Sequence, residues 1–96
     1  MLTYKAMYKF VEDGVHAEVM DFPGAMTCAK DLDAARRLLA GALIDMAEAN
    51  IMEGENLPVP NPEITDSDAD LEEPIHLILN ASSSYTVVPE LAHETA

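Results

Sequence analysis

The chain has 96 residues, with 18 Asp and Glu against five Lys and Arg, and a formal net charge of −13. This length fits one domain with a modest core. The acidity argues against direct nucleic-acid binding, because DNA-binding modules use basic patches to displace phosphate counterions. No run approaches the roughly 18 apolar residues of a membrane span, and no signal-peptide pattern is present. The single cysteine permits no internal disulfide, so we expect a cytoplasmic protein.

The charge is distributed unevenly along the chain. All five basic residues lie within the first 37 residues beside six acids, which gives a net charge of 5 − 6 = −1. From Leu38 onward there are 18 − 6 = 12 acids and no Lys or Arg. Two interpretations follow: the acidity keeps a small domain soluble, or it attracts a protein partner with a basic surface.

The first third of the sequence predicts an antiparallel β-meander. Period-two alternation predicts a strand over Leu2–Val11. The apolar residues that share one face of this strand are Tyr4, Ala6, Tyr8 and Phe10. Asp13 and Gly14 predict a hairpin turn in which glycine supplies a positive φ. A second strand over residues 15–20 and a short third strand over residues 25–29 complete the meander.

A long amphipathic helix is predicted over Leu32–Met52. Asp31 is placed as the N-cap, and Gly54 is placed for the C-cap. Pro58 and Pro60 prevent any continuation. The apolar stripe at helical spacing comprises Leu32, Ala35, Leu39, Ala42, Leu43 and Met46.

The remaining segments complete a single α+β domain. An acidic loop is expected to end at Glu73, and Pro74 precedes a fourth strand that begins at Ile75, followed by a short fifth strand over residues 85–88. We therefore expect one domain with a βββα unit over residues 1–54, a proline-rich and acidic loop over 55–74, C-terminal strands over 75–88 and a tail over 89–96.

The motifs that frame the helix resemble those of a known family. The order is a strand, Asp13-Gly14, a second strand that runs into Asp21-Phe22-Pro23-Gly24, then Thr27, the helix, and an ending from Gly54 that contains Pro58 and Pro60. This pattern over roughly residues 2 to 62 resembles the HicB antitoxin family. The resemblance implies a partial RNase H-like fold, in which a three-stranded meander, one helix and a further strand follow in order. It also implies homo-oligomers and a partner, the small basic RNA-cleaving HicA toxin.

The resemblance stops before the operator-binding part that family members commonly carry. The residues after the helix offer no helix-turn-helix pattern and no basic side chains for phosphate contacts. We therefore expect no direct nucleic-acid binding by this chain, and no membrane association.

No stretch of the sequence predicts catalysis, a cofactor site or a metal site. Asp66, Asp68 and Asp70 have the first three ligand spacings of an EF-hand loop. However, Leu71 and Leu77 occupy the positions of the required Gly and Glu. Cys28 is expected to be an inert, buried or half-buried thiol. We expect a protein that is not an enzyme.

Two functional hypotheses remain open at this stage. The first is a HicB-like antitoxin that binds and neutralises a basic ribonuclease by steric and electrostatic occlusion. Its expected contact residues are Asp45, Glu48, Asp66, Asp68, Asp70, Glu72 and Glu73. The alternative is a stand-alone homo-oligomeric HicB-like module with a structural or small-ligand-binding role. It rests on the missing DNA-binding region and on Leu38 and Ile44, which broaden the apolar surface of the helix beyond one stripe.

Overall fold

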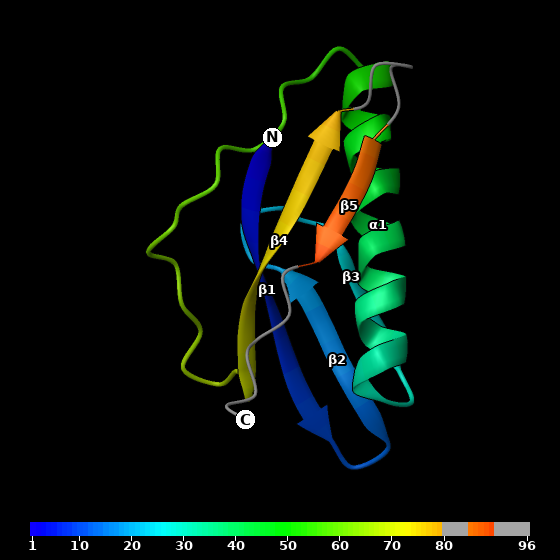
Figure 1. The fold of residues 1–96 in the computed structure, drawn as a ribbon, viewed down its shortest axis with the longest axis vertical. Helices are drawn as coiled ribbons and strands as arrows, with labels where there is room; N and C mark the ends of the chain where they lie inside the picture. Colours follow the sequence, from blue (N-terminus) through cyan, green and yellow to red (C-terminus); the bar gives the residue numbers. More distant parts are fainter. Residues whose placement is uncertain (80–84, 90–96) are drawn as a thin grey trace.

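The computed structural model describes residues 1–79 and 85–89, in which one helix packs on one face of an antiparallel sheet (Figure 1). The fold class is α+β, as predicted. The sheet has five strands in the order β3-β2-β1-β4-β5. The elements are β1 (Leu2–Val11), β2 (Gly14–Val19), β3 (Met26–Ala29), α1 (Leu32–Met52), β4 (Leu71–Leu79) and β5 (Tyr85–Pro89). No helix of the described residues is long and apolar enough to cross a membrane.

The meander buries one face of β1 and β2 against the helix. Its core members are Tyr4, Ala6, Tyr8, Val15, Ala17 and Val19. The alternation predicts that Phe10 shares this buried face, yet Phe10 is 51% exposed. The pairing of β1 with β4 ends at Tyr8, so Phe10 has no neighbouring strand on that side.

The hairpin between β1 and β2 uses Gly14 differently from the prediction. Positive φ occurs at Gly24 and Gly54 but not at Gly14, which is the first residue of β2. A Cβ atom at Gly14 would lie 2.3 Å from the carbonyl oxygen of Ala29. Glycine is therefore required here by the close approach of β3 and not by the turn conformation.

The corner between β2 and β3 forms the predicted Pro-Gly turn. The amide of Ala25 donates to the carbonyl of Phe22 at 3.1 Å, and Gly24 has a φ of 92°. Pro23 therefore occupies the first central position of a type II turn and Gly24 the second. Phe22 enters the core and meets Tyr4 edge to face, with ring centroids 5.5 Å apart.

The helix has the predicted bounds and the predicted N-cap. The side chain of Asp31 accepts a hydrogen bond from the amide of Ala34 at 2.8 Å. The helix ends at Met52 and its C-cap is Glu53, one residue before the predicted Gly54, which follows with a φ of 73°. The fully buried helix residues are Ala34, Ala35, Leu39, Leu43 and Ala47, whereas Leu32 and Met46 pack at the margin of the core.

The segment after the helix sets the direction of β4. Residues 53–70 return along the length of the sheet, on the side away from the helix, before β4 begins (Figure 1). Because of this return, β4 runs antiparallel to β1, whereas a short connection would have produced a parallel pair.

β4 begins at Leu71, four residues earlier than predicted. Pro74 predicts the boundary of the strand, but it lies inside β4. Among the described residues, the pairing of β4 with β5 extends only to Ile75, so β4 borders β1 alone at Pro74. Proline has no backbone N–H to donate to a second neighbouring strand, so it is tolerated where a strand has a neighbour on one side alone. Of the predicted tail, residues 90–96 lie outside the described residues.

Candidate functional site: the anchored loop

The segment over residues 53–70, here called the anchored loop, is acidic throughout its length. It contains six acids and no Lys or Arg, and these acids are Glu53, Glu55, Glu63, Asp66, Asp68 and Asp70. Its backbone has no helix or strand. A loop of this kind needs other contacts to hold its shape, since its backbone groups lack regular partners.

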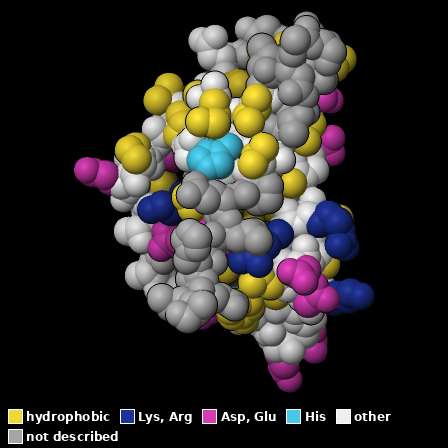
Figure 2. Space-filling view, viewed as in Figure 1, with side chains coloured by type: hydrophobic (Ala, Val, Ile, Leu, Met, Phe, Trp, Pro, Cys, Tyr) yellow, Lys and Arg dark blue, Asp and Glu magenta, His cyan; other side chains and the backbone are white. Residues whose placement is uncertain are grey.

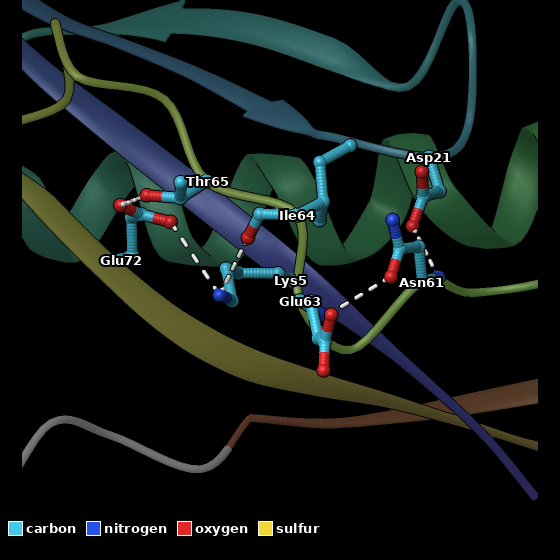
Figure 3. Close-up of polar contacts among 7 residues, drawn as sticks. All are labelled: Lys5, Asp21, Asn61, Glu63, Ile64, Thr65 and Glu72. Carbon is cyan, nitrogen blue, oxygen red and sulfur yellow. Dashed lines mark hydrogen bonds and ion pairs between the residues drawn. The ribbon is translucent and has the colours of Figure 1, made fainter.

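Side chains of the sheet and of the β2–β3 corner hold the first half of the anchored loop. The hydroxyl of Tyr4 donates to the carbonyl of Pro58 at 2.6 Å. The carboxylate of Asp21 accepts from the amide of Asn61 at 2.6 Å, as Figure 3 shows. The two motifs that frame the helix in the sequence therefore meet in space.

The second half of the anchored loop is held from β1 and β4. The ammonium of Lys5 donates to the carbonyl of Ile64 at 2.6 Å and lies 3.6 Å from Oε1 of Glu72 (Figure 3). The other carboxylate oxygen of Glu72 accepts from the hydroxyl of Thr65 at 2.8 Å. Asp70 closes the loop, since its amide donates to the carbonyl of Tyr8 at 2.9 Å and its side chain accepts from the amide of Phe10 at 2.7 Å.

These anchors leave most of the loop acids facing solvent. Glu53, Glu55, Glu63 and Asp68 are exposed, and no ion pair links them to any described residue. Asp66 accepts from the amide of Asp68 at 2.9 Å, which shapes a local turn without neutralising the charge. The anchored loop is thus a fixed scaffold for uncompensated carboxylates.

The structure divides the seven expected contact residues among three places. Asp66, Asp68 and Asp70 belong to the anchored loop, whereas Asp45 and Glu48 are exposed on the helix, which packs on the other face of the sheet (Figure 1). Glu72 and Glu73 lie in β4 and form ion pairs inside the domain. The loop residues therefore come together, and the helix residues do not join them.

Among the expected contact residues, Glu73 differs most from the expectation of a surface acid, because it is only 3% exposed. Its two oxygens accept from Nε and Nη2 of Arg36 at 2.8 and 2.9 Å. Burial beside this carboxylate raises the pKa of the Tyr8 hydroxyl, and the hydrogen bond to Glu73 raises the pKa of Arg36. The Arg36–Glu73 ion pair therefore links the helix to β4 inside the domain. No sequence signal revealed it, because it depends on the register of β4.

Cys28 is exposed, contrary to the expectation of a buried or half-buried thiol. It lies opposite His16 in the β2–β3 pair, with Sγ 3.6 Å from Nδ1 of the imidazole. Nε2 of His16 is in turn 3.2 Å from Oε1 of Glu18. The thiol is exposed because β3 is a strand at the edge of the sheet and Cys28 lies on the face away from the helix.

The described residues contain no group of three or more His, Cys, Asp or Glu that could hold a metal ion. Of the histidines, His76 lies beside Thr3, with 2.8 Å between its Nδ1 atom and the threonine hydroxyl oxygen. His93 lies outside the described residues.

Comparison with known proteins adds no relative. The chain matches no protein-family model and no curated protein sequence. The resemblance to the HicB family therefore depends on the two motifs that frame the helix and on Thr27 between them. Thr27 is a half-buried residue of β3 and is paired with Ala17.

Proposed function

We propose that this chain is a HicB-like antitoxin, which binds a small basic ribonuclease of the HicA type and covers its active surface. The observation that supports this proposal is the anchored loop, which presents exposed carboxylates with no internal counter-charge. A partner rich in Lys and Arg supplies the missing charge, and the field of the loop accelerates its association.

Preorganisation of the loop strengthens this argument. A flexible acidic segment would lose conformational entropy when it binds, and that loss weakens the complex. Tyr4 and Lys5 donate hydrogen bonds to the loop backbone and Asp21 accepts one from it, and these three bonds fix the loop in the free protein. Binding then requires little further ordering of the backbone.

Charge at the end of the helix supports the same partner chemistry. Glu48 and Glu53 lie near the helix C-terminus, and the last turn contains no basic residue. Acids at this end oppose the helix dipole and destabilise the free helix. A cationic partner relieves this repulsion, so the arrangement favours a bound state.

The test is inhibition of RNA cleavage by the basic protein that copurifies with this chain at low salt. The loop variant Glu63→Gln/Asp68→Asn is compared with the control Glu12→Gln/Asp13→Asn, which removes the same charge from exposed positions at the β1–β2 hairpin. We expect the loop variant to raise the Kd about tenfold, or about 1.4 kcal/mol, and the control to change it much less.

Full RNA cleavage in the presence of an equimolar amount of the wild-type chain would refute the antitoxin function. Equal effects of the two double variants would refute the role of the anchored loop, because only the overall charge would then matter. Added salt must weaken the complex if the contacts are electrostatic.

A second candidate function, a stand-alone homo-oligomeric module, is favoured by apolar exposure on the helix. Leu38, Ile51 and Met52 are 48%, 53% and 88% exposed. Such side chains are candidates for burial between subunits. Light scattering tests this candidate, since a monomer at high concentration would exclude it.

A further inference from the structure

A small pocket lies where the anchored loop crosses β1 and β4. It has a volume of about 200 Å³ and is lined by Thr3, Tyr4, Lys5, Asn61, Pro62 and Pro74. In the space-filling view, hydrophobic side chains gather on the upper part of the face that carries β4 and β5, and acidic side chains lie toward its margins (Figure 2). Asn61 and Pro62 belong to the anchored loop, so the pocket adjoins the acidic segment that we assign to partner binding.

The volume limits what can occupy this pocket. Sites for cofactors and drug-sized ligands usually measure about 300–1,000 Å³. A cavity of about 150 Å³ can hold a benzene ring. A pocket of 200 Å³ is therefore suited to one large side chain of a partner protein and is too small for a typical cofactor.

The chemistry of the walls favours an aromatic side chain with a polar tip. Pro62 and Pro74 supply apolar ring surfaces, while Asn61 and Thr3 supply polar groups. Lys5 contributes its methylene stem, because its ammonium is held by Ile64 and Glu72 and points away from Asn61 (Figure 3). Tyrosine combines an apolar ring with a hydroxyl and is enriched among the residues that dominate binding energy at interfaces.

We propose that this pocket receives a tyrosine of the basic partner, with Lys or Arg residues beside that tyrosine pairing with the acids of the anchored loop. This proposal rests on the proposed function and adds to it the residue type of the partner that enters the pocket. Glu63 follows Asn61 and Pro62 closely in the chain and is exposed, so a base adjacent to the bound tyrosine has a carboxylate within the same segment.

Short peptides test the pocket without the partner protein. The probes are acetyl-Lys-Tyr-Lys-amide, acetyl-Lys-Leu-Lys-amide and acetyl-Lys-Ala-Lys-amide, titrated into the full chain with NMR detection of backbone amides. We expect saturable shifts at Thr3, Lys5 and Asn61 with the tyrosine peptide, and at least tenfold weaker binding of the alanine peptide. The leucine peptide should bind between the two.

A matched pair of variants locates the binding. Thr3→Trp fills the pocket, whereas Val11→Trp places the same ring on the same face of the same strand, at its exposed end. We expect the first variant to lose the tyrosine-dependent shifts and the second to keep them. If Thr3→Trp does not fold, intermolecular nuclear Overhauser effects from the tyrosine ring to Pro62 and Pro74 in the wild type decide the question.

Equal affinity for the tyrosine and alanine peptides, or equal effects of the two tryptophan variants, would overturn the proposal. These outcomes are independent of toxin inhibition. If the chain inhibits a ribonuclease but does not prefer the tyrosine peptide, the proposed function stands and tyrosine binding in the pocket is refuted. If the chain prefers the tyrosine peptide but inhibits no ribonuclease, tyrosine binding in the pocket stands and the antitoxin function is refuted.

Discussion

Glu72 and Glu73 are adjacent in β4 and yet have opposite roles, because successive residues of a strand face opposite sides of a sheet. Glu73 faces the helix, is buried, and holds Arg36 through two hydrogen bonds. Glu72 faces the anchored loop and is about one quarter exposed, and its Oε1 atom has no hydrogen-bond partner.

The difference shows how the domain treats its two faces. On the helix side, an acid is fully paired and contributes to a fixed core. On the loop side, an acid shares a lysine with a backbone carbonyl, and the two side chains of this ion pair are 28% and 25% exposed. We expect substitutions on the helix side to change global stability, and substitutions on the loop side to change local order and binding.

The largest effect is expected from Arg36→Met. This substitution leaves the Glu73 carboxylate buried without its counter-charge, and removing one partner of a buried pair costs about 3–5 kcal/mol. Urea unfolding measures the loss. The double variant Arg36→Met/Glu73→Leu should recover most of it, since no buried charge remains. A loss below about 1 kcal/mol for the single variant would contradict the role assigned to this pair.

Lys5→Met should cost less, about 1–2 kcal/mol, because water can reach Glu72 once the lysine is gone. Hydrogen exchange of the amides near Ile64 and Thr65 should accelerate, since the loop loses an anchor there. Lys9→Met is the matched control, because Lys9 lies on the same face of β1 and is exposed. Unchanged loop exchange in Lys5→Met would show that the other anchors suffice.

Asp21→Asn should have a smaller effect, about 0.5–1.5 kcal/mol. It replaces a carboxylate that accepts from the amide of Asn61 with a neutral acceptor. Exchange should accelerate near Asn61, whereas the helix amides keep their protection. If the helix amides exchanged as fast as the amides near Asn61, the loop and the core would unfold together.

The smallest effect at neutral pH concerns Tyr8, whose pKa is raised above its ordinary value of 10.0 by burial and by Glu73. Above pH 10 the unfolded chain loses the tyrosine proton while the folded chain keeps it, so stability falls as pH rises. Thermal melting between pH 9 and 11 should show this decline. The decline should be shallower in Tyr8→Phe than in the wild type, and equal slopes would refute this account.

Local features and long-range contacts also differ in how far the sequence predicted them. Local patterns gave the bounds of β1 and α1, the Asp31 N-cap and the turn at Gly24, because each depends on neighbours within a few residues. The early start of β4, the burial of Glu73 and the anchors of the loop depend on which strand lies beside which. Period-two alternation carries no information about that choice.

The candidate site was predicted only in part for the same reason. The acidity of residues 66–70 and the two framing motifs were evident in the sequence. That Tyr4 and Asp21 hold the chain near Pro58 and Asn61 was not, since hydrogen bonds from side chain to distant backbone leave no periodic signal.

The pairing of β1 with β4 has a consequence for synthesis on the ribosome. Leu2 pairs with Leu77, so one edge of β1 stays open until β4 has been synthesised, whereas the meander and helix need only residues 1–52. An open strand edge invites pairing with other chains. Residues 53–70, which contain six acids and no Lys or Arg, are synthesised just before β4, and we expect their charge to disfavour association of this edge with other acidic chains.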